Sequence, residues 1–111
     1  MSMAEAARGN DPAPVFAALG DRTRLSLLMR LSDGVTRSIT MLSSDTSLTR
    51  QAVTKHLRVL EDAGLVECVR HGRERRFGCR LEPLDEARAY LDRVSRQWDD
   101  ALGRLKAFVE K

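Results

Sequence analysis

The chain has 111 residues, the length of a single small domain. Its content of 42% hydrophobic and 32% charged residues is typical of a soluble globular protein and excludes a disordered one. No apolar run approaches the roughly 20 residues that a membrane-spanning helix needs. Residues 1–10 lack the apolar core of a signal peptide, so we expect a flexible tail there and a cytoplasmic protein. Two cysteines are too few for a disulfide framework.

The excess of positive charge lies in the middle of the chain. Residues 47–82 contain eight basic and five acidic side chains, whereas residues 1–46 contain five of each and residues 83–111 six of each. This distribution is expected of a surface that meets a polyanion, although an ordinary solvated face can carry a similar cluster.

Two helices are predicted in the first third of the chain. A start at residues 11–14, where proline fits the first turn, leads into an apolar segment that ends at Gly20. Asp21 is a favourable N-cap for a second helix over residues 22–32. Leucines cover most of the surface of that second helix, which indicates burial on more than one side.

A short helix and a longer one follow, joined by a short connection. Ser38 can cap a helix over residues 39–44, and Thr49 can cap a helix over residues 50–63 that Gly64 closes. The longer helix turns an apolar row with i, i+4, i+7 spacing inward, namely Val53, Leu57 and Leu60.

The outward face of the helix over residues 50–63 has the chemistry of a DNA reader. In the major groove Arg or Lys suits guanine, Gln suits adenine, and Thr can bond a base or a phosphate. His56 and Arg58 lie farther round or farther along, where the phosphate backbone is the better partner. The predicted DNA-binding residues of this segment are Thr49, Arg50, Gln51, Thr54, Lys55, His56 and Arg58.

The apolar period then changes from helix-like to strand-like. Residues 65–70 and 75–81 predict a β-hairpin with glycine in its turn. If Arg70 pairs with Arg75, one face of the hairpin can pack on the helices. That face holds Val66, Cys68, Phe77 and Cys79. Arg73 and Arg75 stand near the tip, where they can touch a minor groove or a flanking phosphate.

A last long helix is predicted from Pro83 onward. Its apolar residues follow a heptad, with one row formed by Leu84, Leu91, Trp98 and Leu105 and the other by Ala87, Val94, Ala101 and Phe108. Four heptads of this kind need a partner helix along their whole length, which indicates a homodimer.

The order of these elements predicts an α+β, mainly helical, winged helix-turn-helix fold. It has about five helices and a two-stranded β-hairpin as the wing. After the tail, residues 11–82 form the DNA-binding core and residues 83–111 the dimerisation helix, together making one domain.

Three segments of the chain resemble the ArsR-type winged-helix repressors. Residues 18–25 look like the opening signature of the family, ALGDRTRL. Residues 48–66 are similar to its recognition helix, LTRQAVTKHLRVLEDAGLV, and residues 72–77 to its wing, GRERRF. The resemblance covers about residues 14–82 and implies a repressor that binds an operator near its own promoter and is released by a signal. It also implies dimerisation through the first and last helices, with the interface residues Val15, Phe16, Leu84, Leu91, Val94, Trp98, Leu105 and Phe108.

The chain departs from the metal-sensing members of that family. Many of them hold a thiophilic metal through a Cys-x-Cys pair before the recognition helix, and Ser38 and Thr40 stand at those positions here. Neither hydroxyl is a ligand for a soft metal. Others use Asp and His on the last helix, but residues 84–111 contain no His. We therefore predict a member of the metal-independent branch with no cofactor; the sequence does not identify an inducing ligand.

Two other functions remain as alternatives, and an enzyme is not expected. Cys68 and Cys79 would lie diagonally across the hairpin, which suits small buried hydrophobes better than a disulfide, but a thiol-based redox-responsive repressor stays open. A winged-helix protein-interaction module without DNA binding is the other alternative. No Ser/His/Asp set, carboxylate pair or phosphate loop is present, so no catalytic residue is predicted.

Overall fold

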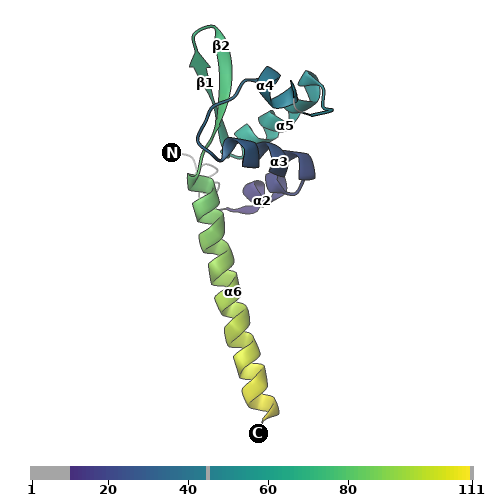
Figure 1. Cartoon of the computed structure of the whole chain (residues 1–111). Helices are drawn as coiled ribbons and strands as arrows, with labels where there is room; N and C mark the ends of the chain where they lie inside the picture. The colour runs from purple at the N-terminus through teal and green to yellow at the C-terminus, as the bar shows by residue number, and fades with distance from the viewer. Residues whose placement is uncertain (1–10, 45, 111) are drawn as a thin grey trace.

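The computed structural model describes residues 11–44 and 46–110, so the predicted tail over residues 1–10 lies outside the described residues. In chain order the elements are α2 (Ala13–Leu19), α3 (Arg22–Leu31), α4 (Ile39–Ser44), α5 (Arg50–Asp62), β1 (Val66–His71), β2 (Glu74–Cys79) and α6 (Glu82–Val109). Helices α2 to α5 gather in one body, the β1–β2 hairpin projects from it, and α6 runs away from it as a long rod (Figure 1). This is the winged helix-turn-helix arrangement predicted from the sequence. None of the helices in the described stretches combines the length and apolar character needed to cross a membrane.

Helices α3, α4 and α5 begin at the capping residues that the sequence predicts. The Asp21 carboxylate accepts a hydrogen bond from the backbone N–H of Arg24 at 3.0 Å, which opens α3. The Thr49 hydroxyl oxygen accepts one from the N–H of Ala52, also at 3.0 Å, which opens α5. Ser38 caps α4 in the same way. Each cap satisfies an N–H that has no partner inside its helix.

Helix α5 ends in a Schellman motif built around Gly64. The backbone of Gly64 is left-handed, with φ 78°, and its N–H donates to the carbonyl of Glu61 at 2.9 Å. The N–H of Leu65 donates to the carbonyl of Leu60, also at 2.9 Å, and both leucine side chains are fully buried. This paired bonding with its apolar contact is the standard way in which glycine closes a helix.

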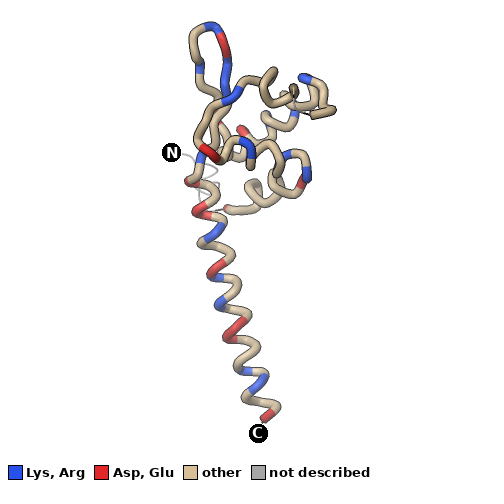
Figure 2. The backbone as a smooth tube through the Cα atoms, viewed as in Figure 1, with Lys and Arg blue, Asp and Glu red and all other residues tan. Residues whose placement is uncertain are grey.

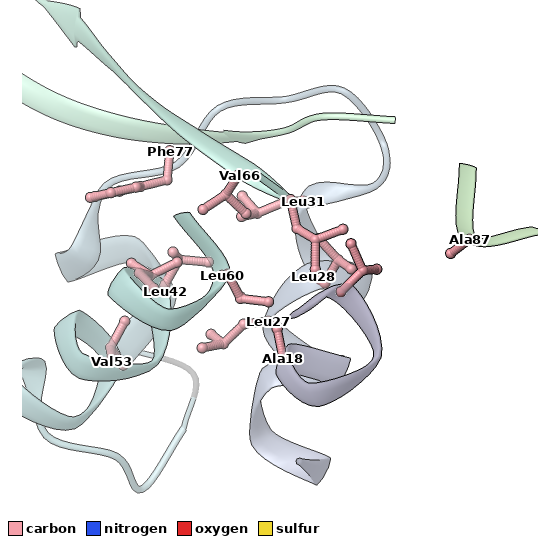
Figure 3. Packing of buried hydrophobic residues seen from close by; sticks show 13 residues of the cluster. Ala18, Leu27, Leu28, Leu31, Leu42, Val53, Leu60, Val66, Phe77 and Ala87 are labelled. Atoms are coloured by element: carbon pink, nitrogen blue, oxygen red, sulfur yellow. The ribbon is translucent and has the colours of Figure 1, made fainter. Parts of the chain in front are cut away.

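The apolar core lies between α3, α4, α5 and the base of the hairpin. Figure 3 shows leucines of α3 and α5 meeting Leu42 of α4 and Phe77 of β2, with Ala87 of α6 set apart from them. The core corrects one interface assignment. The side chain of Val15, predicted to face a second copy, is only 7% exposed and packs within this chain, so it offers little surface to a partner.

The hairpin has the predicted register. Arg70 lies opposite Arg75 and Cys68 opposite Phe77 in an antiparallel pair. The strands continue one residue farther toward the tip than predicted, which leaves a two-residue turn that begins at Gly72 with φ 67°. A glycine in the first position of such a turn is typical of type II′, whose twist matches that of the flanking strands.

A backbone bridge that the sequence did not reveal ties the hairpin to the segment between α3 and α4. The N–H of Arg37 donates to the carbonyl of Phe77 at 3.0 Å, and the N–H of Phe77 donates back at 2.8 Å. The Arg37 guanidinium also donates to the backbone carbonyl of Arg30 and, at 2.8 and 3.0 Å, to the Asp33 carboxylate. This hydrogen-bonded cation lowers the pKa of Asp33 to about 2. The base of the wing is therefore fixed to α3.

We predict that Gly64→Ala destabilises the protein by about 1–2 kcal/mol, because any residue with a Cβ is strained in the left-handed conformation. The added Cβ would lie 3.5 Å from Cγ of Pro83, an ordinary contact, so backbone strain alone causes the loss. Urea unfolding at fixed protein concentration measures it. Gly103→Ala in α6 is the matched control, since its Cβ meets nothing within 4 Å and alanine favours a helix by about 1 kcal/mol. Equal stability of the Gly64→Ala variant and wild type would contradict the strain.

Candidate nucleic-acid interface

The outward face of α5 is polar because its opposite face is used by the core. Val53, Leu57 and Leu60 are all at most 1% exposed. Helical geometry then turns the residues between them toward solvent. Four of the predicted DNA-binding residues are exposed, Gln51, Lys55 and Arg58 on this side and Arg50 in the first turn of the helix. Together they combine three cationic side chains with one amide, a set that can contact both phosphates and base edges.

The two threonines of this segment also form hydrogen bonds with the backbone of α5. The Thr49 hydroxyl oxygen accepts the N–H of Ala52, so Thr49 is first of all the cap of the helix. The Thr54 hydroxyl donates to the carbonyl of Arg50 at 2.7 Å. Its proton is therefore used inside the helix, and a lone pair and the methyl group remain for a DNA base.

His56 does not share the exposed face with Gln51 and Lys55. Its ring is largely covered and turned toward the start of α3, where Nδ1 lies 3.5 Å from Nη1 of Arg24 and 4.0 Å from Oδ1 of Asp21. The pKa of Asp21 is lowered, chiefly by the hydrogen bond from the N–H of Arg24, with the charges of Arg24 and His56 adding to it. The contacts of His56 within the chain are therefore with Arg24 of α3 and its cap Asp21, and its contact with a phosphate stays a prediction.

The hairpin carries its exposed arginines on both strands and in the turn (Figure 2). Arg73 stands in the turn, as predicted. Arg75 is exposed but lies back along the hairpin, where its Nε donates to the Sγ of Cys68 at 3.4 Å. Arg76 is paired with Glu74 through a 2.9 Å hydrogen bond. Arg73 is therefore the cation best placed to reach beyond the tip.

Arg30 supports the helix-turn-helix in a way that sequence reasoning missed. Its guanidinium donates to the carbonyl of Leu42 at 2.7 Å and to that of Met41 at 3.3 Å, near the end of α4. Carbonyls in the last turn of a helix lack a backbone partner inside it, and that of Met41 also accepts the Ser44 hydroxyl at 3.0 Å. The only sequence signal for this role is an arginine in a helix whose other positions are mostly apolar.

Comparison with known proteins identifies the family. Residues 19–69 match the family described as a helix-turn-helix domain. The uncharacterized HTH-type transcriptional regulator YuzN of Bacillus subtilis (strain 168) is 45% identical over 82 residues, which cover 68% of this chain and 88% of that protein. An ArsR-like transcriptional regulator from Rhodococcus sp. RHA1 is 36% identical and superposes with a TM-score of 0.79 over 96% of both chains. The chain belongs to the ArsR-like family of winged helix-turn-helix transcriptional regulators.

A third relative of this ArsR-like regulator is the homodimeric winged helix-turn-helix DNA-binding domain from Mycobacterium bovis. It is 27% identical, with a TM-score of 0.62, and the match covers 94% of this chain and 93% of that one. The chain is thus a DNA-binding transcriptional regulator, and its exposed α5 face and Arg-bearing wing are the surfaces with the chemistry for that role.

The positions where other family members place metal ligands have structural roles or lie open in this regulator. Ser38 is buried, and its hydroxyl oxygen accepts the N–H of Met41 at 3.2 Å, so it serves α4 as a cap. Thr40 is exposed on the same helix. Within residues 11–44 and 46–110 no three His, Cys, Asp or Glu side chains gather as a metal site would require. Cys68 and Cys79 are both free thiols in register positions that are diagonal to each other.

We predict that Gln51→Ala and Arg73→Ala have different effects on DNA binding. Loss of the Gln51 amide should cost about 1–3 kcal/mol on the operator and little on random DNA, because an amide that pairs with a base reads sequence. Loss of Arg73 in the turn should weaken both complexes to a similar degree, because a phosphate contact is independent of sequence. Fluorescence anisotropy with both duplexes measures the two losses. Equal losses for Gln51→Ala on both DNAs would show that another residue reads the sequence.

Proposed function

We propose that this regulator represses transcription as a homodimer that occupies a palindromic operator, including one upstream of its own gene. Residues 11–82 form the DNA-binding core and residues 83–111 the dimerisation helix. Because its target is DNA, we place it in the cytoplasm and assign it no cofactor or metal. The observation that carries the proposal is the apolar stripe of α6, which stays exposed along the part of the helix that leaves the core (Figure 1).

The stripe of α6 is too apolar to be a free surface. Trp98 is 64% exposed and Phe108 76%, and both belong to the predicted interface. The other exposed apolar residues of the helix are Leu91, Leu102, Leu105 and Val109, of which Leu102 and Val109 extend the prediction. Contiguous apolar surface of this kind marks a contact with another protein. The homodimeric relative from Mycobacterium bovis supports a second copy of this chain as that protein.

The start of α6, unlike its distal part, packs against the core of its own chain. Leu84 is half-buried against the core, and the ring of Phe16 lies 6.0 Å from that of Tyr90. Leu84 and Phe16, both predicted to contact a second copy, are thus partly buried by contacts within this chain. This junction of α2 and α6 borders a groove of about 900 Å³ lined by Pro12, Pro14, Pro83, Ala87 and Tyr90 among others.

The sizes of the side chains along the stripe favour an antiparallel pair of α6 helices. Leu91 and Trp98 stand in one heptad row and the smaller Val94 and Ala101 in the other. In a parallel pair each residue meets its own copy, so one layer of two tryptophans lies next to a layer of two alanines. In an antiparallel pair whose two-fold axis crosses the helices at the level of residue 96, Trp98 lies opposite Val94 of the second copy and Leu91 opposite its Ala101. Large residues then face small ones, which fills the interface evenly, and the tip of each helix reaches the partner's groove.

In a two-fold dimer, each copy can place its recognition helix on one half of the operator. Two recognition helices about one DNA turn apart require a rigid link with two-fold symmetry, and they match a palindromic site. A 28-residue helix supplies that link because it is about 42 Å long at 1.5 Å per residue.

We predict that operator affinity falls steeply with salt, which tests DNA binding directly. The basic residues of α5 and the wing are doubled by dimerisation. If they neutralise about 6–10 phosphates, binding weakens by roughly 10³–10⁵ between 50 and 200 mM salt. Fluorescence anisotropy with DNA from upstream of the gene measures it. A nearly flat response would exclude the proposed interface and favour a protein-interaction module.

We predict that Trp98→Ala dissociates the dimer and thereby weakens operator binding, although every DNA-facing residue is retained. A buried tryptophan replaced by alanine costs about 3–5 kcal/mol. Arg96→Ala, on the opposite side of the helix, is the control and should leave the dimer intact. Analytical ultracentrifugation reports the association state, and anisotropy the affinity. A Trp98→Ala dimer with unchanged affinity would refute this role of α6.

The direction of the helices is tested in the same samples by cysteine cross-linking. With Cys68 and Cys79 changed to serine, an antiparallel pair cross-links Leu91→Cys to Ala101→Cys of the other copy when the two proteins are mixed. A parallel pair instead cross-links Leu91→Cys to itself, which would overturn the antiparallel arrangement.

A further inference from the structure

We propose that Arg24 fixes the orientation of the recognition helix α5 relative to α2, and that His56 is the residue of α5 through which it does so. The inference rests on the proposed function, since it concerns how the operator is read. Arg24 and His56 are positioning residues in this account: neither is assigned a contact with DNA.

Arg24 is anchored on α2 by two hydrogen bonds. Its side chain is only 18% exposed, and its Nε donates to the carbonyl of Ala18 at 2.6 Å. Nη2 donates to the carbonyl of Ala17 at 3.3 Å. These carbonyls belong to the last turn of α2, where the backbone hydrogen bonds of the helix end. The carbonyl of Ala17 also accepts the N–H of Gly20 at 3.2 Å. The planar guanidinium is thereby held in one orientation at the end of α2.

The third guanidinium nitrogen points to α5. Nη1 lies 3.5 Å from Nδ1 of His56 and 3.9 Å from Oδ2 of Asp21. Asp21 is itself fixed, because its other carboxylate oxygen accepts the backbone N–H of Arg24. One side chain thus connects the end of α2, the start of α3 and the flank of α5.

The position of His56 makes this contact a control on rotation of α5. His56 is on the flank of the helix, between the buried row and the exposed face that carries Gln51 and Lys55. Apolar packing is non-directional, so it resists separation of α5 from the core better than it resists a small rotation. A rotation of about 20° moves a side chain 5–6 Å from the helix axis by about 2 Å. That displacement breaks a hydrogen bond to a base edge, whose length must stay near 3 Å.

The contact requires an acceptor on His56, because every nitrogen of the Arg24 guanidinium is a donor. Nδ1 is that acceptor when the ring proton is on Nε2.

The test compares the full-length protein with Arg24→Gln, His56→Ala and His56→Asn on operator and random duplexes. Arg24→Gln and His56→Ala should reduce the ratio of operator to random affinity by about tenfold, equivalent to about 1.4 kcal/mol, with random affinity nearly unchanged. His56→Asn should keep the ratio, because its amide oxygen can accept from Arg24 in place of Nδ1.

Several results would overturn the inference. An unchanged ratio in His56→Ala, or equal losses on both DNAs as a phosphate contact would give, excludes the positioning role. So does a His56→Asn variant that loses as much as His56→Ala. If Arg24→Gln does not fold, as circular dichroism would reveal, the two His56 variants decide the question alone. A wild-type protein that prefers no operator would instead refute the proposed function, and the inference with it.

Discussion

The contact between α3 and α5 determines where everything else in this regulator lies. Leu27 and Leu31 on one helix and Leu57 and Leu60 on the other are at most 1% exposed. Each fully buried leucine contributes about 1.5–3 kcal/mol relative to an exposed one, so no rotation of α5 that exposes this row can compete. With one side of α5 committed to the core, the side that carries Gln51 must face solvent. The polar recognition surface is thus a consequence of apolar packing behind it.

The same reasoning explains why α6 cannot be complete in one chain. Its apolar row is continuous, but its surroundings change along the helix. Ala87 is buried, Leu84 is half-buried, and from Leu91 onward the apolar side chains on the row are mostly exposed. Because a helix is a stiff rod, burial of the distal part by a second copy would also fix the separation of two α5 helices. Stability and operator spacing are then set by one surface.

Features governed by local rules were predictable from the sequence. Asp21 and Thr49 cap the helices they precede, Gly64 ends α5, and the Arg70–Arg75 pairing sets the hairpin register. Each depends on residues only a few positions apart. By contrast, α2 has only seven residues, and its sequence period does not decide whether Val15 or its neighbour faces the core.

Features that depend on contacts between distant segments were not predictable. The Arg37–Phe77 bridge joins residues forty positions apart, and the turn of His56 toward Arg24 spans thirty-two. No local propensity encodes either. The exposure of Gln51 and Lys55 was predictable, because it follows from the burial of Val53, Leu57 and Leu60 on the other side of the helix.

The arginines of this chain have two different roles that a count of charges does not separate. The first 46 residues balance in charge, yet three of their arginines, Arg24, Arg30 and Arg37, have guanidinium groups that donate to backbone carbonyls of neighbouring segments. Lysine could not replace them, because only a planar guanidinium presents several donors in fixed directions. Arginines of α5 and the turn are instead exposed. In so small a core, the polar framework that holds the recognition helix and the surface that meets DNA are therefore made from the same residue type, and only its surroundings separate the two uses.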